Sequence, residues 1–202
     1  MSEILPVTED RLDDLAELFE SNNATKGCWC MAYILSRSEY HHGGRGGNRE
    51  HFEQMAATAD PPMGLLAYRE GRPIGWCALG PRTRYPPAIS PRATILRDRD
   101  PDEDEDVWLV PCFFVRVGER RRGLTREMLN TAVELARERG VKAVEGWPLA
   151  SDYPSADEYL GREQVFEACG FECIRRPSPR RAVMRLDLQE ASSQRRARTQ
   201  KL

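Results

Sequence analysis

The chain has no long apolar segment. Nowhere in its 202 residues do about 18 consecutive apolar residues occur, the length that a membrane-spanning helix needs. The first seven residues include acidic Glu3 and no apolar run of the kind found in secretory signals. We therefore expect a soluble, cytoplasmic protein with no membrane partner.

The chain also lacks an excess of charge of either sign. Its 30 Lys and Arg residues stand against 32 Asp and Glu residues, which leaves a formal net charge of −2. Such a balance provides no general attraction to nucleic acid or to an anionic membrane surface. A nucleic-acid-binding function is therefore disfavoured, and charge-based selectivity must be local.

Cysteine and histidine are few. Of the six cysteines, four lie in or beside apolar stretches, where cysteine usually behaves as a small buried hydrophobe; these are Cys77, Cys112, Cys169 and Cys173. We expect free thiols rather than disulfides. Cys28 and Cys30, together with the histidines, suggest a metal site, but the spacing of Cys28, Cys30, His41, His42 and His51 fits no common zinc signature. We predict no bound metal.

The apolar pattern indicates one domain over residues 1–188, followed by a polar, Arg-rich tail at 189–202 that we expect to be disordered. Strands are predicted at 4–7, 64–69, 73–79, 107–115, 141–147, 171–174 and 182–188. Helices are predicted after Thr8, from Asn48 to Ala59, and at 125–140 and 157–169. No internal repeat occurs. This order predicts an α/β (α+β) fold, in which a mixed sheet with one strand-helix-strand crossover has helices on both faces.

Three segments depart from regular periodicity. Residues 40–48 contain four glycines and are predicted to form a mobile loop. Residues 80–106 contain five prolines and end in an acidic run at 98–106, so we expect this segment to be exposed. Pro111 interrupts the apolar run at 107–115 and suggests a bulge or a broken ladder there.

The sequence Arg-Arg-Arg-Gly-Leu-Thr at 120–125 separates the predicted strand 107–115 from the predicted helix that follows. The first turn of a helix has unpaired N–H groups and partial positive charge, so it favours a bound anion. Gly123 allows a phosphate to approach the backbone closely. The glycine patterns of Rossmann and P-loop nucleotide sites are absent. The alternative is that the arginines only begin a surface helix.

This junction resembles the pyrophosphate loop of the GNAT acetyltransferase superfamily, Gln/Arg-x-x-Gly-x-Gly/Ala, and Gly170-Phe171 matches the Gly-Phe that follows the last helix of that family. The resemblance covers roughly residues 3–188 and implies a mostly antiparallel, twisted sheet. It implies an N-acetyltransferase that uses acetyl-CoA and transfers the acetyl group directly to a primary amine. A non-catalytic acyl-CoA-binding or regulatory module is the alternative.

The resemblance also implies which residues bind the cosubstrate. The backbone N–H groups of Arg122, Gly123, Leu124 and Thr125 would bind the pyrophosphate, beside the charges of Arg120 and Arg121. The strand segment Phe113, Phe114 and Val115 would pair with the pantetheine arm. Thr125 departs from the small residue that usually ends the motif, although its hydroxyl offers a further donor.

Catalytic candidates are less well defined. Asp106 and Glu105 precede the central strand and are candidates for a base acting through water; the alternative is a solvated acidic face. Many members of the superfamily have a Tyr four residues before the Gly of Gly-Phe as the acid for the leaving thiolate, and here that position is Phe166. Tyr159 and Cys169 are the candidates to replace it, unless both only pack in the core.

The resemblance suggests that the region between the first two helices forms a wall of the acceptor pocket, with Trp29 and Tyr33 as lining; in the alternative, Trp29 and Met31 belong to the core. Trp76, with Arg82 and Tyr85, is a further candidate for the border of this pocket. The acidic run favours a cationic acceptor, either a small molecule or a peptide amine. Assembly as a homodimer is left open.

Overall fold

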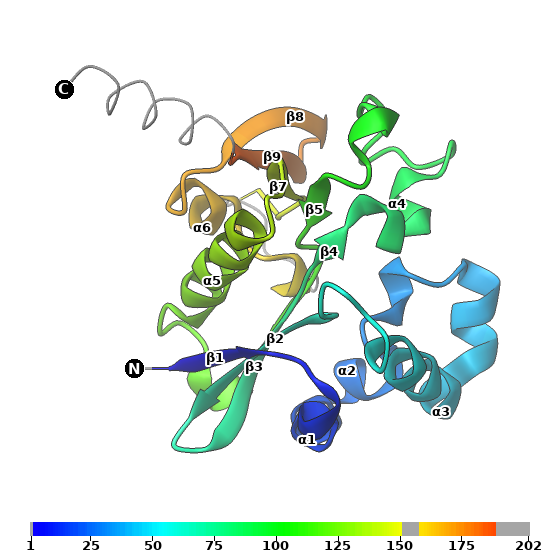
Figure 1. Cartoon of the computed structure of the whole chain (residues 1–202), viewed down its shortest axis with the longest axis vertical. Coiled ribbons are helices and arrows are strands. Elements are labelled where there is room, and N and C mark those ends of the chain that lie inside the picture. The colour runs from blue at the N-terminus through cyan, green and yellow to red at the C-terminus, as the bar shows by residue number, and fades with distance from the viewer. Residues whose placement is uncertain (1, 151–157, 189–202) are drawn as a thin grey trace.

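The structure, a computed structural model, describes residues 2–150 and 158–188 (Figure 1). Its strands form two sheets, ordered β1-β2-β3-β6 and β4-β5-β7-β9-β8. The strands are β1 (Glu3–Pro6), β2 (Gly64–Arg69), β3 (Arg72–Ala78), β4 (Gly80–Pro81), β5 (Val107–Leu109), β6 (Phe113–Val115), β7 (Ala143–Gly146), β8 (Glu172–Ser178) and β9 (Arg181–Asp187). All named strand pairs are antiparallel except β5 with β7. The predicted mixed, mostly antiparallel sheet is confirmed.

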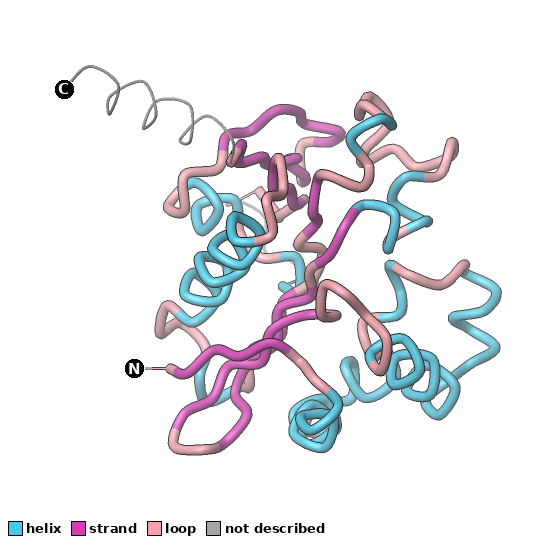
Figure 2. Tube along the Cα trace, viewed as in Figure 1, coloured by secondary structure: helices cyan, strands magenta, loops and turns pink. Residues whose placement is uncertain are grey.

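Helices cover both faces of this sheet (Figures 1 and 2). The α-helices are α1 (Leu12–Glu20), α2 (Asn23–Cys28), α3 (Arg37–Ala56), α4 (Pro86–Ile89), α5 (Leu124–Glu138) and α6 (Glu163–Glu167), and short 3-10 turns are η1 (Glu9–Arg11), η2 (Met31–Tyr33), η3 (Arg82–Arg84), η4 (Pro101–Glu103), η5 (Val117–Glu119) and η6 (Glu158–Leu160). Helix α5 connects β6 to β7, which lies parallel to β5, so the predicted crossover is present. No helix in the described ranges is both long and apolar enough to cross a membrane.

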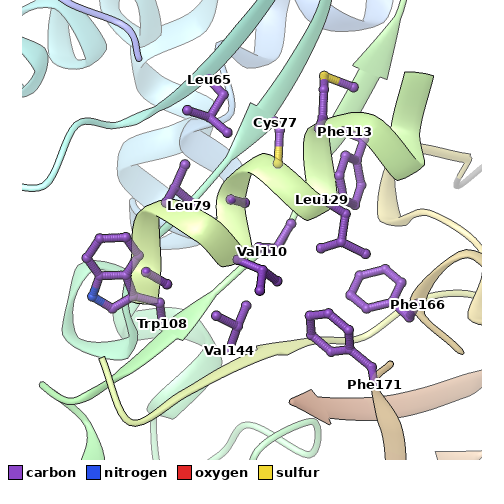
Figure 3. Packing of buried hydrophobic residues seen from close by; sticks show 14 of the residues in the cluster. Leu65, Cys77, Leu79, Trp108, Val110, Phe113, Leu129, Val144, Phe166 and Phe171 are labelled. Atoms are coloured by element: carbon purple, nitrogen blue, oxygen red, sulfur yellow. The ribbon is translucent and has the colours of Figure 1, made fainter. Parts of the chain in front are cut away.

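Two apolar cores lie on opposite faces of the central strands. One core packs α5 onto the sheet through residues such as Met128, Leu129 and Ala132 (Figure 3). The other packs α1 and the segments after it through Leu15 and Phe19. Neighbouring side chains of a strand point to opposite faces, so Phe113 belongs to the α5 core and Phe114 to the other. The segment around β6 is therefore covered on both faces, as its continuous apolar sequence predicts.

The predicted strand at 107–115 is divided by a bulge at Pro111. Gly80 pairs with Leu109 and Cys77 pairs with Phe113, so residues 78 and 79 face residues 110–112, two residues against three. The extra residue shifts the register and ends β5 before β6 begins. Pro111 has no N–H to contribute to a ladder, which explains why the irregularity predicted there, a bulge or a broken ladder, occurs at this position.

The prediction of a mobile loop at 40–48 is wrong, because these residues lie in α3. Ser36 accepts a hydrogen bond from the Glu39 N–H, and the Glu39 side chain accepts one from the Ser36 N–H, which forms a capping box. Asn48 is not a cap; its Nδ2 donates to the Gly27 carbonyl at 2.8 Å and joins α3 to α2. The glycines produce a kink, at Gly44 with φ of 53°, rather than a loop.

The segment 80–106 is also less exposed than predicted. Arg82, Tyr85 and Leu96 are buried, and so is Asp104 of the acidic run. Burial is tolerated because the charges are paired: Arg82 contacts Asp104 at 3.3 Å, and Arg99 Nε contacts Asp104 at 2.9 Å. The sequence pattern showed the charges but not their partners.

The predicted helix 157–169 is shorter in the structure. Gly161, with φ of 76°, separates η6 from α6, because a left-handed residue cannot continue a right-handed helix. The remaining strands and helices lie close to their predicted ranges. Residue 157 and the predicted disordered tail at 189–202 lie outside the described residues.

Candidate active site

A cavity of about 390 Å³ lies between β6, the start of α5 and the η6–α6 segment. Its lining combines aromatic and apolar side chains with a group of arginines: Phe113, Phe114, Val115, Glu119, Arg120, Arg121, Gly123, Leu124, Thr125, Arg126, Tyr159, Gly161, Arg162 and Val165. Eight of the nine residues predicted to bind the cosubstrate are among them. The exception is Arg122. The structure therefore brings the predicted strand segment and the predicted loop to one site.

The free edge of β6 faces this cavity. Strand β6 is the last strand of its sheet and, among the strands that the structure describes, pairs only with β3. The Ala78 N–H donates to the Cys112 carbonyl, and the Arg116 N–H donates to the Ile74 carbonyl, both at 2.9 Å. Successive residues of a strand direct their backbone groups to opposite edges, so Phe113 and Val115 direct theirs away from β3. In agreement, the Val115 carbonyl accepts a hydrogen bond from Arg120 Nε at 3.1 Å.

The start of α5 has the backbone geometry that suits an anion. Gly123 is the N-cap residue, with a left-handed φ of 83°, and its carbonyl accepts the N–H groups of Arg126 and Glu127 at 3.0 and 3.1 Å. The N–H groups in the first turn of α5 have no carbonyl acceptor within the helix. A Cβ added at Gly123 would meet no atom within 4 Å, so the space beside this backbone is open to a ligand. The geometry fits a phosphate.

The three arginines before Gly123 differ in placement. Arg120 and Arg121 line the cavity, and Arg121 has a left-handed φ of 63°. Arg122 is exposed and is not part of the cavity lining. Its side chain contacts the carboxylate of Glu119, a lining residue, at 3.5 Å. Arg126 and Arg162 add further positive charge to the lining. Sequence reasoning missed Arg162, because only the fold places η6–α6 opposite α5.

Tyr159, which belongs to η6, lines the cavity. Its ring stacks on Phe114, with centroids 6.3 Å apart and 24° between the planes. Phe166 is fully buried, edge-on to Phe113 at 6.1 Å and to Phe171 at 5.0 Å (Figure 3). Cys169 is partly buried and does not line the cavity. Of the two candidates to replace the expected tyrosine, only Tyr159 lies at the site.

Glu105 and Asp106 lie away from the cavity. Both are exposed and precede β5, whereas the cavity lies beside β6, beyond the bulge. Glu105 accepts a hydrogen bond from the Thr83 hydroxyl at 3.2 Å, and the Asp106 backbone carbonyl accepts one from the Lys142 N–H at 2.8 Å. Both carboxylates therefore belong to a solvated acidic face, as in the alternative interpretation. The structure brings neither of them to the cavity.

Three of the four aromatic residues predicted for the pocket, Trp29, Trp76 and Tyr85, belong to the core. Trp29 is 2% exposed and Trp76 is 0% exposed, so neither side chain can contact an acceptor. The prediction of these two residues as pocket lining is wrong, and the alternative, in which Trp29 and Met31 are core residues, holds. Tyr33 is partly exposed and contacts Trp147, with ring centroids 5.7 Å apart. Burial raises the pKa of Tyr33 above its usual range, so the phenol is neutral.

A buried ion network lies beneath the strands next to the bulge. Arg82 Nε and Nη2 donate to the two carboxylate oxygens of Glu145 at 3.1 and 2.7 Å, and Arg185 Nη1 donates to Oε1 at 2.9 Å. The Glu145 backbone carbonyl accepts the Val110 N–H at 2.8 Å. Removing one partner of such a pair typically costs about 3–5 kcal/mol. The network therefore anchors the strand immediately before the bulge, and Arg82 and Tyr85 serve the interior rather than the border of a pocket.

The residues of the considered metal site do not converge. Cys30 is buried, whereas His41, His42 and His51 are exposed on α3. Among the residues that the structure describes, no group of three or more His, Cys, Asp or Glu side chains is arranged to hold a metal ion.

Residues 28–171 match the acetyltransferase (GNAT) family, which covers more than half of the chain, and the chain belongs to this family. It is similar to the PaiA N-acetyltransferase of Thermoplasma acidophilum in complex with coenzyme A, at 12% identity over 93% of this chain and 99% of that one (TM-score 0.54). It is also similar to the ribosomal-protein-S18-alanine N-acetyltransferase of Escherichia coli, at 13% identity over 93% and 94% (TM-score 0.51). A third similar structure is YncA of Salmonella typhimurium with acetyl-CoA, at 15% identity over 94% and 95% (TM-score 0.53). No curated protein sequence matches. At these identities the structural likeness shows the fold, and the family match shows the class of enzyme, an acetyltransferase.

Proposed function

We propose that this enzyme transfers the acetyl group of acetyl-CoA directly to a primary amine. The observation that carries the proposal is the meeting, in one cavity, of the open N-terminus of α5 at Gly123 and the free edge of β6. A phosphate site and an unpaired strand edge suit the two ends of one elongated ligand, a pyrophosphate joined to an amide-containing arm. When bound, acetyl-CoA supplies an activated acetyl thioester.

Different residues of the cavity bind different parts of acetyl-CoA. The N–H groups of Gly123, Leu124 and Thr125 donate to the pyrophosphate, and Arg121 neutralises its charge. The Phe113 carbonyl and the backbone groups of Val115, which point away from β3, pair with the pantetheine amides. The Phe113 N–H, which follows the bulge, is also the donor placed to stabilise negative charge on the acetyl carbonyl oxygen.

Tyr159 is the proposed acid for the leaving thiolate. Its position over Phe114 places a phenol at the cavity wall, and the expected tyrosine is replaced by the fully buried Phe166. A thiol of ordinary pKa near 8.5 leaves fairly readily, so the phenol accelerates a step that is already accessible. The acceptor is a small-molecule or peptide amine. Because the acidic run lies away from the cavity, we assign this amine no additional charge.

Two measurements test the proposal. Thermal shift with acetyl-CoA should raise the midpoint of unfolding, because a ligand that binds only the folded state stabilises it. Release of free coenzyme A thiol should then be followed with polyamines, aminoglycosides, amino acids and peptides as acceptors. A thermal shift with no thiol release for any amine would favour a non-catalytic binding module. No shift at saturating acetyl-CoA would reject cosubstrate binding and transfer together.

A further inference from the structure

Two thiols from distant parts of the chain meet behind the bulge. The Sγ atoms of Cys30 and Cys112 lie 3.4 Å apart, across a sequence separation of 82 residues. Cys30 follows α2 and is the N-cap residue of η2, and Cys112 is the last residue of the bulge, directly before Phe113. Both are buried, at 6% exposure each. Free cysteines of the core commonly contact apolar side chains, whereas these two contact each other.

The pair is held in an organised polar chain. Trp76 Nε1 donates to Cys30 Sγ at 2.9 Å, the Cys30 thiol donates to Cys112 Sγ, and the Cys112 thiol lies 3.9 Å from the Phe113 carbonyl. An indole N–H can only donate, so it favours negative charge on Cys30 Sγ. The hydrogen bond to Cys112 and burial raise the pKa of Cys30 despite this donor, so Cys30 is a thiol at rest.

The backbone that presents Cys30 is strained. Trp29 and Cys30 have successive left-handed φ values of 47° and 54°, a conformation that is uncommon for a residue with a side chain and an outlier for a bulky one. The Trp29 ring packs edge-on against Phe19, with centroids 5.3 Å apart, and at a tilt against Phe52, with centroids 5.9 Å apart. Strained residues that the surrounding core enforces often mark functional positions. Here the enforced turn brings Cys30 to the bulge.

We propose that Cys30 and Cys112 are a redox-active dithiol, which a small hydroperoxide closes to a disulfide that slows acetyl transfer. The sulfur of Cys30 attacks a peroxide oxygen, the O–O bond breaks, and the proton of the Cys30 thiol passes to the leaving hydroxide, so that a sulfenic acid and one water form. The sulfur of Cys112 then displaces the second water. In sum, two thiols and one hydrogen peroxide give one disulfide and two waters. The oxidation site stands independently, whereas its effect on transfer rests on the proposed function.

The effect on transfer follows from the position of Cys112. A disulfide requires the two sulfurs to approach to about 2.05 Å, and they begin at 3.4 Å. This approach pulls on Cys112, whose carbonyl carbon is bonded to the Phe113 nitrogen. The N–H of Phe113 is the proposed donor to the acetyl oxygen. Displacement of such a donor is costly because catalysis depends on its position to a fraction of an ångström.

Oxidation with hydrogen peroxide tests the site without reference to activity. The protein should carry Cys169→Ser and Cys173→Ser to remove the thiols outside the core. We expect a mass loss of two hydrogen atoms and a tryptic cross-link between residues 27–37 and 100–116, reversed by dithiothreitol. Cys112→Ala and, independently, Cys30→Ala should abolish the cross-link, whereas the matched control Cys28→Ser should retain it. Oxygen addition without a cross-link, or a cross-link through Cys28, would overturn the assignment.

Acetyl transfer is then compared in the oxidised and reduced protein. We expect the rate to fall about tenfold on oxidation, as for partial loss of an oxyanion donor, and to recover on reduction, while the melting midpoint rises by several degrees because the cross-link closes a long loop. Cys30→Ala should show no dependence on peroxide. A disulfide that forms but leaves the rate unchanged would overturn the regulatory half of the proposal. Failure of every amine as acceptor would instead reject the proposed function, and the cross-link would still be measured.

Discussion

The ring of Tyr159 stacks on the ring of Phe114, with 6.3 Å between the centroids and 24° between the planes. Phe114 belongs to β6 and Tyr159 to η6, so this contact joins the strand edge proposed to bind pantetheine to the segment that closes the cavity from the other side. The stacking holds the phenol at the cavity wall, where it can act on a ligand paired with β6.

Tyr159→Phe removes the phenol and keeps the stacking ring. We expect kcat to fall about 100-fold, the lower range for loss of a general acid, with the Kd of acetyl-CoA changed less than twofold. Stopped thiol-release assays and calorimetry measure the two quantities. Unchanged turnover with intact acetyl-CoA binding would reject Tyr159 as the acid. Tyr159→Leu, which loses both features, should weaken binding as well.

Gly123→Ala should weaken acetyl-CoA binding at least tenfold. Its φ of 83° is strained for any residue with a Cβ, at about 1 kcal/mol or more, and the added methyl group would project into the open space beside the α5 N-terminus. Gly118→Ala is the matched control, because its Cβ also meets open space but has no left-handed backbone to strain. Equal affinities of the two variants would contradict a phosphate site at Gly123.

Arg121→Gln and Arg122→Gln compare the contributions of a charge inside the cavity and a charge outside it to the binding of coenzyme A. Arg121 lines the cavity, whereas Arg122 is exposed, is not part of the lining, and contacts the lining residue Glu119 from outside. A hydrogen bond to a charged group contributes about 1.5–3 kcal/mol, so Arg121→Gln should raise the Kd of coenzyme A about tenfold or more, and Arg122→Gln by less than twofold. Both substitutions keep a Cβ, so Arg121→Gln leaves the left-handed strain at that position unchanged. A larger effect at Arg122 would show that the loop rearranges on binding.

Stability should fall in acid partly through Glu103. The hydrogen bond from Lys142 and the neighbouring Arg185 hold the pKa of Glu103 below its ordinary value of 4.5. A carboxyl group with a lowered pKa in the folded state binds more protons when unfolded, so its stabilisation is present above that ordinary value and is lost as pH falls through the folded pKa.

Glu103→Gln should therefore flatten the decline of the unfolding free energy below pH 4.5, by up to about 1 kcal/mol for a pair near the surface. Urea titrations between pH 3 and pH 7 measure the difference, where the pH limits bracket the range over which carboxyl groups titrate. Glu105→Gln serves as the control, because Glu105 is exposed and its carboxylate, within the described part of the chain, accepts a hydrogen bond from a hydroxyl group and not from a charged side chain. Parallel pH profiles of the wild type and Glu103→Gln would contradict the assignment.

Local chemistry made much of the fold predictable. The hairpin of β2 and β3, the amphipathic α5 and the bulge at Pro111 each follow from neighbouring residues: alternation, helical spacing and a missing N–H. Gly123 was predictable for the same reason, since one residue without a Cβ at a helix start already indicates an anion site.

Other features depended on partners distant in the chain. The glycines at 43–47 indicated a loop, and the helix forms because Ser36 caps it and Asn48 joins it to α2. Asp106 and Glu105 resembled a base beside the central strand, yet the bulge separates the start of β5 from the cavity. Trp29 and Trp76 resembled pocket residues, and only their mutual burial with Phe19 and Phe52 shows them as core.

The sequence alone thus determined the order of elements, the glycine turn before α5 for which phosphate binding is proposed, and the strand that flanks it, because each depends on residues within a few positions of one another. Tertiary structure decided which side chains face the cavity, which charges are paired in the interior, and that Cys30 meets Cys112. These depend on contacts between segments that are separated by tens of residues, and no local pattern encodes such distances.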